Sequence, residues 1–154
     1  METLTDIGET ELAYALLLQR KNPSWLYSVD QGATTVWERW TSYTRDKGFG
    51  PVSMNSFNHY AYGAVLGWLY KCAAGIQLEC GAVMFAPHPD ARLGFVDARC
   101  RASAGEVRAA WRYRADGGVD YAFSVPQGMA ATLELPGEAP VALTSGEWTF
   151  SRER

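Results

Sequence analysis

The strongest candidate for acid–base chemistry is Glu38, which lies between two tryptophans in the run Trp37-Glu38-Arg39-Trp40. Residues 33–40 are rich in β-branched and aromatic types, which predicts a short extended segment. Side chains alternate in such a segment, so we expect Glu38 and Trp40 on one side and Trp37 and Arg39 on the other. A carboxylate among indoles and without a cation has its charged form disfavoured, which is how a general base is tuned. The alternative is a surface glutamate on an ordinary strand.

The second candidate is His59, in the run 55–60 (NSFNHY). Apolar residues from Asn55 to about Ala74 follow a helical pattern, which predicts a long helix with Asn55 as its N-cap. His59 would lie one turn into this helix, where the helix dipole favours the neutral imidazole. The alternative is a core histidine bonded to a backbone carbonyl, and the pattern does not decide between the two.

Aromatic residues are abundant: the chain has six Trp, eight Tyr and six Phe among 154 residues. Such a content requires either a large core or a ligand with flat apolar faces, and sugars are ligands of this kind. Trp25, Tyr27, Tyr43 and Tyr62 are the candidates for stacking on a sugar. Core packing is the commoner role for such a group.

Composition excludes several classes of function. The net charge of −3 and the acidic pI of about 5.4 exclude the basic footprint of a nucleic-acid binder. No apolar run approaches the roughly 18 residues of a membrane span. Cys72, Cys80 and Cys100 do not have metal-site spacing, so neither a metal nor another cofactor is expected. The N-terminus lacks the features of a signal peptide, which indicates a cytoplasmic protein if this start is the natural one.

The elements that must position these residues change character near residue 75. Apolar positions within residues 9–19 predict a helix. Later runs at 81–85, 106–114 and 119–125 predict strands, and Asp116-Gly117-Gly118 predicts a hairpin between the last two. The expected fold class is therefore α+β, with a helical part at 1–75 and an antiparallel β-sandwich at 76–154.

Two long motifs closely resemble the bacterial α-L-rhamnosidases of glycoside hydrolase family 78. The first is residues 32–40 (GATTVWERW), and the second is residues 54–65 (MNSFNHYAYGAV), followed by Trp68-Leu69-Tyr70. The stretches at 14–17, 23–25, 125–136 and 145–148 are also similar to that family. The resemblance covers essentially the whole chain.

The resemblance implies that the chain corresponds to the last helices of an (α/α)6 catalytic barrel followed by a C-terminal β-sandwich. The family cleaves terminal α-L-rhamnosides with inversion. By resemblance Glu38 is the general base, His59 touches the rhamnose, and Trp37 and Trp40 shape the pocket. The general acid of the family lies in an upstream acidic, Trp-containing stretch that nothing in residues 1–37 matches. We therefore expect a glycosidase fragment that is inactive alone and whose partner is a rhamnose-containing glycoside.

Other interpretations remain open from the sequence. The chain could be a non-catalytic module, in which the sandwich binds carbohydrate or supports another domain and the helical part is a docking segment. An (α/α)6 glycosidase for another sugar is a further possibility. Because the predicted long helix is apolar all round, we expect exposed faces that a second copy, the sandwich or an absent N-terminal catalytic portion must cover.

Overall fold

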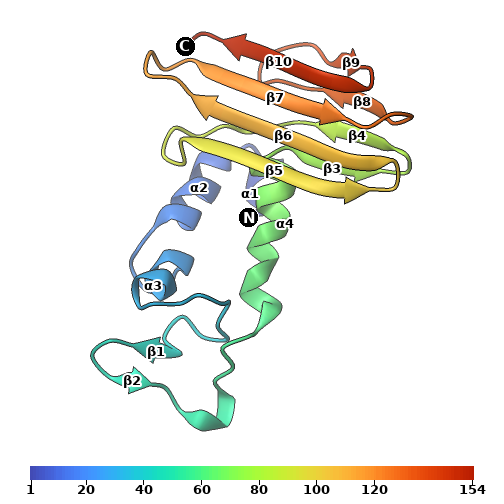
Figure 1. Ribbon diagram of the computed structural model, residues 1–154. Helices are drawn as coiled ribbons and strands as arrows, with labels where there is room; N and C mark the ends of the chain where they lie inside the picture. Colours follow the sequence, from blue (N-terminus) through green and yellow to red (C-terminus); the bar gives the residue numbers. More distant parts are fainter. The chain divides into compact units, whose positions relative to one another are not determined.

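The computed structural model describes residues 1–154, which form two compact units, 1–66 and 67–154. The chain combines helices and sheets, which confirms the predicted α+β class (Figure 1).

Unit 1 begins with three short helices, α1 (Glu2–Asp6), α2 (Thr10–Leu18) and α3 (Trp25–Asp30). α2 confirms the helix predicted over 9–19. α3 begins after Ser24, whose hydroxyl accepts a hydrogen bond from the Tyr27 amide and thereby satisfies an orphan donor of the first turn.

The segment predicted to be extended, 33–40, contains no strand, so that prediction was wrong. A turn at its end replaces the strand: the Ser42 amide donates to the Arg39 carbonyl, and the Arg39 amide donates to the Ser42 hydroxyl. Strict alternation fails accordingly, because Trp37 is buried whereas Arg39 is exposed. The chain continues through the hairpin of β1 (Tyr43–Thr44) and β2 (Gly48–Phe49) and the single turn η1 (Val52–Met54).

The helix expected from Asn55 begins later. A continuous helical stretch runs through the 3-10 turn η2 (Tyr60–Ala64), α4 (Val65–Trp68) and the π-helical turn η3 (Leu69–Ala73). Its N-cap is His59 rather than Asn55. The Asn55 amide instead donates from Nδ2 to the Ser42 carbonyl at 2.9 Å, so it holds two loops together.

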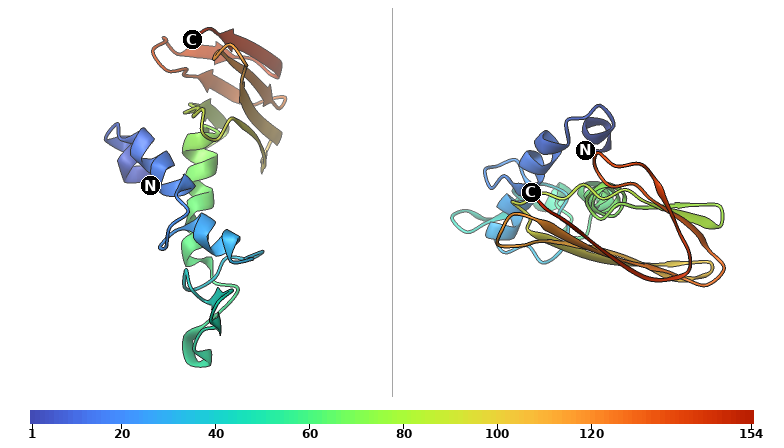
Figure 2. Two further views of the ribbon diagram at one scale, coloured as in Figure 1. Left: turned by 90° about the vertical axis from the view of Figure 1, so that its left-hand side faces the viewer. Right: turned by 90° about the horizontal axis from the view of Figure 1, so that it is seen from above.

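Unit 2 contains two four-stranded sheets that face each other (Figures 1 and 2). One sheet has the order β10-β7-β6-β5 and is antiparallel throughout; its strands are β5 (Phe95–Ala102), β6 (Gly105–Tyr113), β7 (Val119–Val125) and β10 (Gly146–Arg152). The other has the order β3-β4-β8-β9, with β3 (Ile76–Glu79), β4 (Ala82–Phe85), β8 (Ala130–Leu133) and β9 (Val141–Leu143). The pair β4–β8 is parallel, so the predicted sandwich is present but is not antiparallel everywhere.

Alternating residues of both sheets fill the space between them. Val107, Ala109 and Trp111 of β6 are buried there, and the rings of Phe85 and Phe123 meet across the two sheets with centroids 4.8 Å apart. Trp111 also donates from Nε1 to the Ala73 carbonyl at 2.7 Å, which satisfies both polar groups inside the core.

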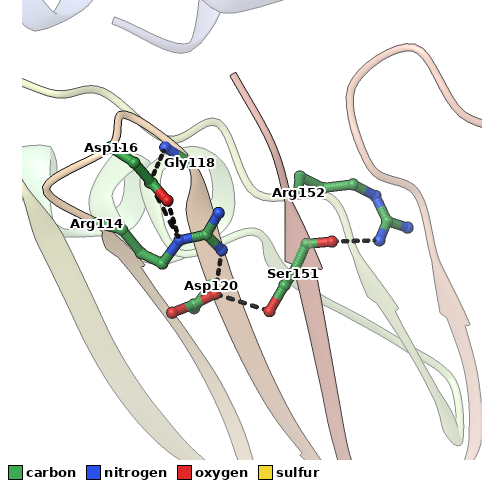
Figure 3. Close-up of polar contacts among 6 residues, drawn as sticks. All are labelled: Arg114, Asp116, Gly118, Asp120, Ser151 and Arg152. Atoms are coloured by element: carbon green, nitrogen blue, oxygen red, sulfur yellow. Dashed lines mark hydrogen bonds and ion pairs between the residues drawn. The ribbon is translucent and has the colours of Figure 1, made fainter.

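The β6–β7 hairpin confirms the predicted turn at Asp116-Gly117-Gly118. Asp116 accepts hydrogen bonds from the Gly118 amide and from the Arg114 guanidinium (Figure 3). Arg114 also pairs with Asp120 at 2.8 Å, and the Ser151 hydroxyl donates to the same Asp120 oxygen at 2.7 Å. These contacts lower the pKa of Asp120, chiefly through the Ser151 hydrogen bond and then through Arg114.

Neither a membrane-spanning helix nor a metal-binding cluster is found in the described chain. None of its helices has both the length and the apolar character needed to cross a bilayer. It contains no group of three or more His, Cys, Asp or Glu side chains placed to hold a metal ion.

Candidate active site

The carboxylate of Glu38 is half-buried and is held by the backbone of Ser56. The Ser56 amide donates to Glu38 Oε2 at 2.8 Å, and the Glu38 amide donates to the Ser56 carbonyl at 2.9 Å. This reciprocal pair fixes the backbone of Glu38 and the direction of its side chain together. The other carboxylate oxygen, Oε1, forms no hydrogen bond or ion pair within the chain, so it can accept a hydrogen bond from water.

The same two chain segments carry His59. The His59 amide donates to the Val36 carbonyl at 2.8 Å, and the Thr35 hydroxyl donates to the Phe57 carbonyl at 2.5 Å. With the Glu38–Ser56 pair, these bonds join residues 35–38 to residues 56–59. The structure thus brings the segments of the two predicted site residues side by side, although they are 21 positions apart in the sequence.

His59 caps the helical stretch that follows it. Its Nδ1 accepts a hydrogen bond from the Ala61 amide at 3.3 Å. A ring nitrogen that accepts carries no proton, so a neutral His59 has its proton on Nε2. The side chain thereby offers one hydrogen-bond donor to a ligand.

Trp40 belongs to an aromatic stack that includes two of the four predicted stacking residues. It lies on Tyr62 with ring centroids 3.7 Å apart and an interplanar angle of 17°, and it meets Trp25 edge-on at 5.3 Å. Trp25 in turn donates from Nε1 to the Tyr62 carbonyl at 2.9 Å. The two contacts and this hydrogen bond restrict the rotamer of Trp40.

Trp37 belongs to a different aromatic group. Its ring makes edge contacts with Tyr43 at 6.5 Å and Phe57 at 5.4 Å, and these three rings with Phe49 line a cavity of about 350 Å³. Trp37 and Trp40 also share the lining of a smaller, mostly apolar cavity of about 120 Å³. The fourth predicted stacking residue, Tyr27, lies in neither ring cluster.

The backbone of Ser56 and the hydroxyl of Thr35 were not singled out from the sequence. Serine and threonine in an irregular segment carry no pattern, because their role here depends on which distant carbonyl or carboxylate they meet. The sequence associates Ser56 with a candidate site residue only because it lies in the same run, 55–60, as His59.

Comparison with known proteins gives matches in both units. The family model of the bacterial alpha-L-rhamnosidase 6 hairpin glycosidase domain matches residues 1–73, and that of the bacterial alpha-L-rhamnosidase C-terminal domain matches residues 81–149. An alpha-L-rhamnosidase of Formosa agariphila is 42% identical over 138 residues, which are 88% of this chain and 15% of that protein.

Solved structures agree. The chain superposes on the Streptomyces avermitilis alpha-L-rhamnosidase complexed with L-rhamnose with a TM-score of 0.87 and 37% identity, covering 97% of this chain and 17% of that one. For the native enzyme of Aspergillus terreus the TM-score is 0.90 at 31% identity, covering 98% and 18%. The chain spans about 15% of the length of the curated relatives that it matches. The matches to both of its parts therefore assign this chain to the bacterial α-L-rhamnosidases, a family of glycoside hydrolases, as a portion that matches their C-terminal region.

Proposed function

We propose that this chain contributes the general base to the active site of an inverting α-L-rhamnosidase, with Glu38 as that base. The observation that carries the proposal is the carboxylate of Glu38, clamped by Ser56 through one oxygen in a segment that is bonded to the segment of His59. In this proposal residues 1–75 are the end of the catalytic barrel and residues 76–154 are the C-terminal sandwich.

Inversion requires one carboxylate to activate water and a carboxylic acid, roughly 6.5–9.5 Å away, to protonate the leaving oxygen. The clamp on Oε2 leaves Oε1 of Glu38 to take a proton from the attacking water. We assign the general acid to a part of the enzyme outside these 154 residues. The matched relatives are several times longer, which is consistent with that assignment.

The proposed sugar is a terminal α-L-rhamnose, because the Streptomyces avermitilis relative was solved with L-rhamnose. His59 would donate from Nε2 to a sugar oxygen, with its tautomer set by the Ala61 amide. Trp37 and Trp40 would shape the wall of the pocket, and the stack on Tyr62 would keep Trp40 in position.

Exposed apolar side chains on unit 1 support an origin in a larger barrel. Ile7, Leu12 and Val29 are each about half exposed or more, at 67%, 48% and 54%. We propose that the remainder of the catalytic domain covers them. Light scattering and binding of a hydrophobic dye test this point: a monodisperse monomer that binds no dye would contradict it.

The first experiment is a rhamnosidase assay on the purified chain with methyl α-L-rhamnopyranoside, whose alkoxide leaving group must be protonated as the bond breaks. Without a general acid, we expect no turnover above the buffer rate. Turnover that disappears in Glu38→Gln would show that a complete catalytic pair lies within the chain, and would refute the assignment of the acid to another segment.

The second experiment places this chain in a complete enzyme. Residues 1–154 replace the matching C-terminal portion of the Streptomyces avermitilis enzyme, and proton NMR follows the anomer that forms first. We expect β-L-rhamnose as the first product and a loss of at least about 10³-fold in kcat for Glu38→Gln, with Glu9→Gln, a carboxylate at the start of α2, as the control. An active chimera that keeps its kcat after Glu38→Gln would refute the role of Glu38.

A further inference from the structure

The outward face of the sheet β10-β7-β6-β5 carries a trough that lies wholly within unit 2 and contains no proposed catalytic residue. It has a volume of about 540 Å³, which is within the usual size of a small-ligand site. Ala110 and Ala122, directly opposite each other on β6 and β7, lie among its lining residues. Their methyl groups are small, so the centre of the sheet face is low while longer side chains rise around it.

The next outward row of these strands contains an opposite-charge pair that is not joined. Arg112 of β6 and Asp120 of β7 are direct cross-strand partners, whose Cβ atoms lie about 5 Å apart in such pairs, and opposite charges there normally attract. The Arg112 guanidinium instead lies over the ring of Phe95 on the other side, 4.6 Å from its centroid. The Asp120 carboxylate is engaged through Oδ1 by Arg114 and Ser151 (Figure 3).

The result is a separated donor and acceptor above an apolar floor. Arg112 forms no ion pair and retains its N–H donors, and Oδ2 of Asp120 has no partner among the contacts drawn in Figure 3. The other arginine of the trough, Arg108, by contrast forms a two-pronged ion pair with Asp97, with both N···O distances 2.9 Å.

We infer that this trough binds a neutral sugar unit through a vicinal diol. One hydroxyl donates to Oδ2 of Asp120, its neighbour accepts from Arg112, and the C–H face of the ring lies on the methyl groups of Ala110 and Ala122. Phe95, which is 53% exposed, extends the apolar wall. The charges of Arg112 and Asp120 cancel, which favours a neutral sugar over an acidic one. The inference is independent of the role of Glu38.

The test is an NMR titration of the full chain, labelled in alanine methyl groups, arginine side chains and the tryptophan and histidine rings. The probe is methyl α-L-rhamnopyranoside, and the control probe is its 2,3-O-isopropylidene derivative, which has no vicinal diol. We expect saturable shifts of Ala110, Ala122 and the Arg112 Nε–H, with a millimolar dissociation constant for the diol and no saturation with the blocked sugar.

Matched variants separate this site from the rest of the sheet. Arg112→Gln and Asp120→Asn should each weaken binding about tenfold or more, since each removes a charged hydrogen-bond partner. The control is Arg101→Gln. Arg101 lies on β5, is exposed like Arg112, forms no ion pair and does not line the trough, so this change should leave the affinity for the sugar unchanged.

Equal binding of the blocked sugar, or unchanged affinity in Arg112→Gln and Asp120→Asn, would overturn the inference. Saturable shifts confined to Trp40 and His59 would overturn it as well, while leaving the proposed rhamnosidase role intact. Shifts in the trough alone would support it even if the assays on Glu38 failed.

Discussion

Trp111 and Trp148 allow a direct measurement of what burial adds to one hydrogen bond. Each donates from its indole Nε1 to a backbone carbonyl: Trp111 to Ala73 at 2.7 Å and Trp148 to Thr144 at 2.8 Å. Trp111 is only 2% exposed and Ala73 is fully buried, whereas Thr144 is exposed. Replacement of either tryptophan with phenylalanine removes the donor and keeps an aromatic ring.

The expected costs differ because only one orphaned carbonyl can bind water. In Trp111→Phe the Ala73 carbonyl loses its partner inside the core, at a cost of about 1–3 kcal/mol. The space left by the smaller ring adds about 1 kcal/mol. The free energy of unfolding should therefore fall by about 3 kcal/mol, and the Tm of unit 2 by about 12 °C or more. Trp148→Phe should cost about 1 kcal/mol or less.

Urea unfolding followed by far-UV circular dichroism measures both changes, since the other tryptophans complicate fluorescence. Equal losses in the two variants would refute the reasoning, because they would show that the burial of the acceptor does not matter. A loss below about 1 kcal/mol in Trp111→Phe would do the same.

Three further predictions concern single positions. An added Cβ at Gly75, where φ is +78°, would lie 2.2 Å from the Pro87 nitrogen, so Gly75→Ala should prevent stable folding of unit 2. Gly137 has nearly the same φ, +77°, but nothing lies within 4 Å of an added Cβ, so Gly137→Ala should cost only about 1–2 kcal/mol of the free energy of unfolding. Thermal denaturation of the two variants tests this difference. Burial raises the pKa of Tyr121 to about 12, so the stability that its neutral form provides is complete below pH 10 and is lost as pH rises towards 12. In Tyr121→Phe the free energy of unfolding, measured by urea titration at alkaline pH, should fall less steeply with pH. The hydrogen bond from Arg108 lowers the pKa of Asp97, so the stability that the Asp97 carboxylate provides is present above about pH 4 and falls as pH drops through the lowered pKa. Asp97→Asn should therefore reduce the slope of the free energy of unfolding against pH below 4. An unchanged slope would contradict this prediction.

The sandwich was largely predictable because its strands alternate. In β6 and β7 every second residue is buried, and the pattern of 106–114 and 119–125 expresses that period directly. The parallel pairing of β4 with β8 was not predictable in the same way, since it depends on a contact between distant segments.

The sequence motifs pointed to candidate residues but did not predict the local geometry around them. The indole-flanked Glu38 and the helix-capping His59 were found by motif, but the extended conformation expected around Glu38 was wrong. β-branched and aromatic residues favour strands only where a partner strand exists, and here residues 35–38 instead bond to the irregular segment 56–59. The roles of Glu38 and His59 in the reaction stay predictions.

The parallel β4–β8 pair has a consequence for the order in which unit 2 assembles. The strands β5, β6 and β7 lie between these two in the chain, and they pair with their sequence neighbours. Loops between near neighbours close at a smaller entropic cost than distant ones, so the β5–β6–β7 meander can form early. The pairing of β4 with β8 is then expected to follow, once the folded meander has brought these two strands close together. Nascent chains that end before β8 would therefore expose one edge of β4, together with the inner face of the meander, to neighbouring molecules.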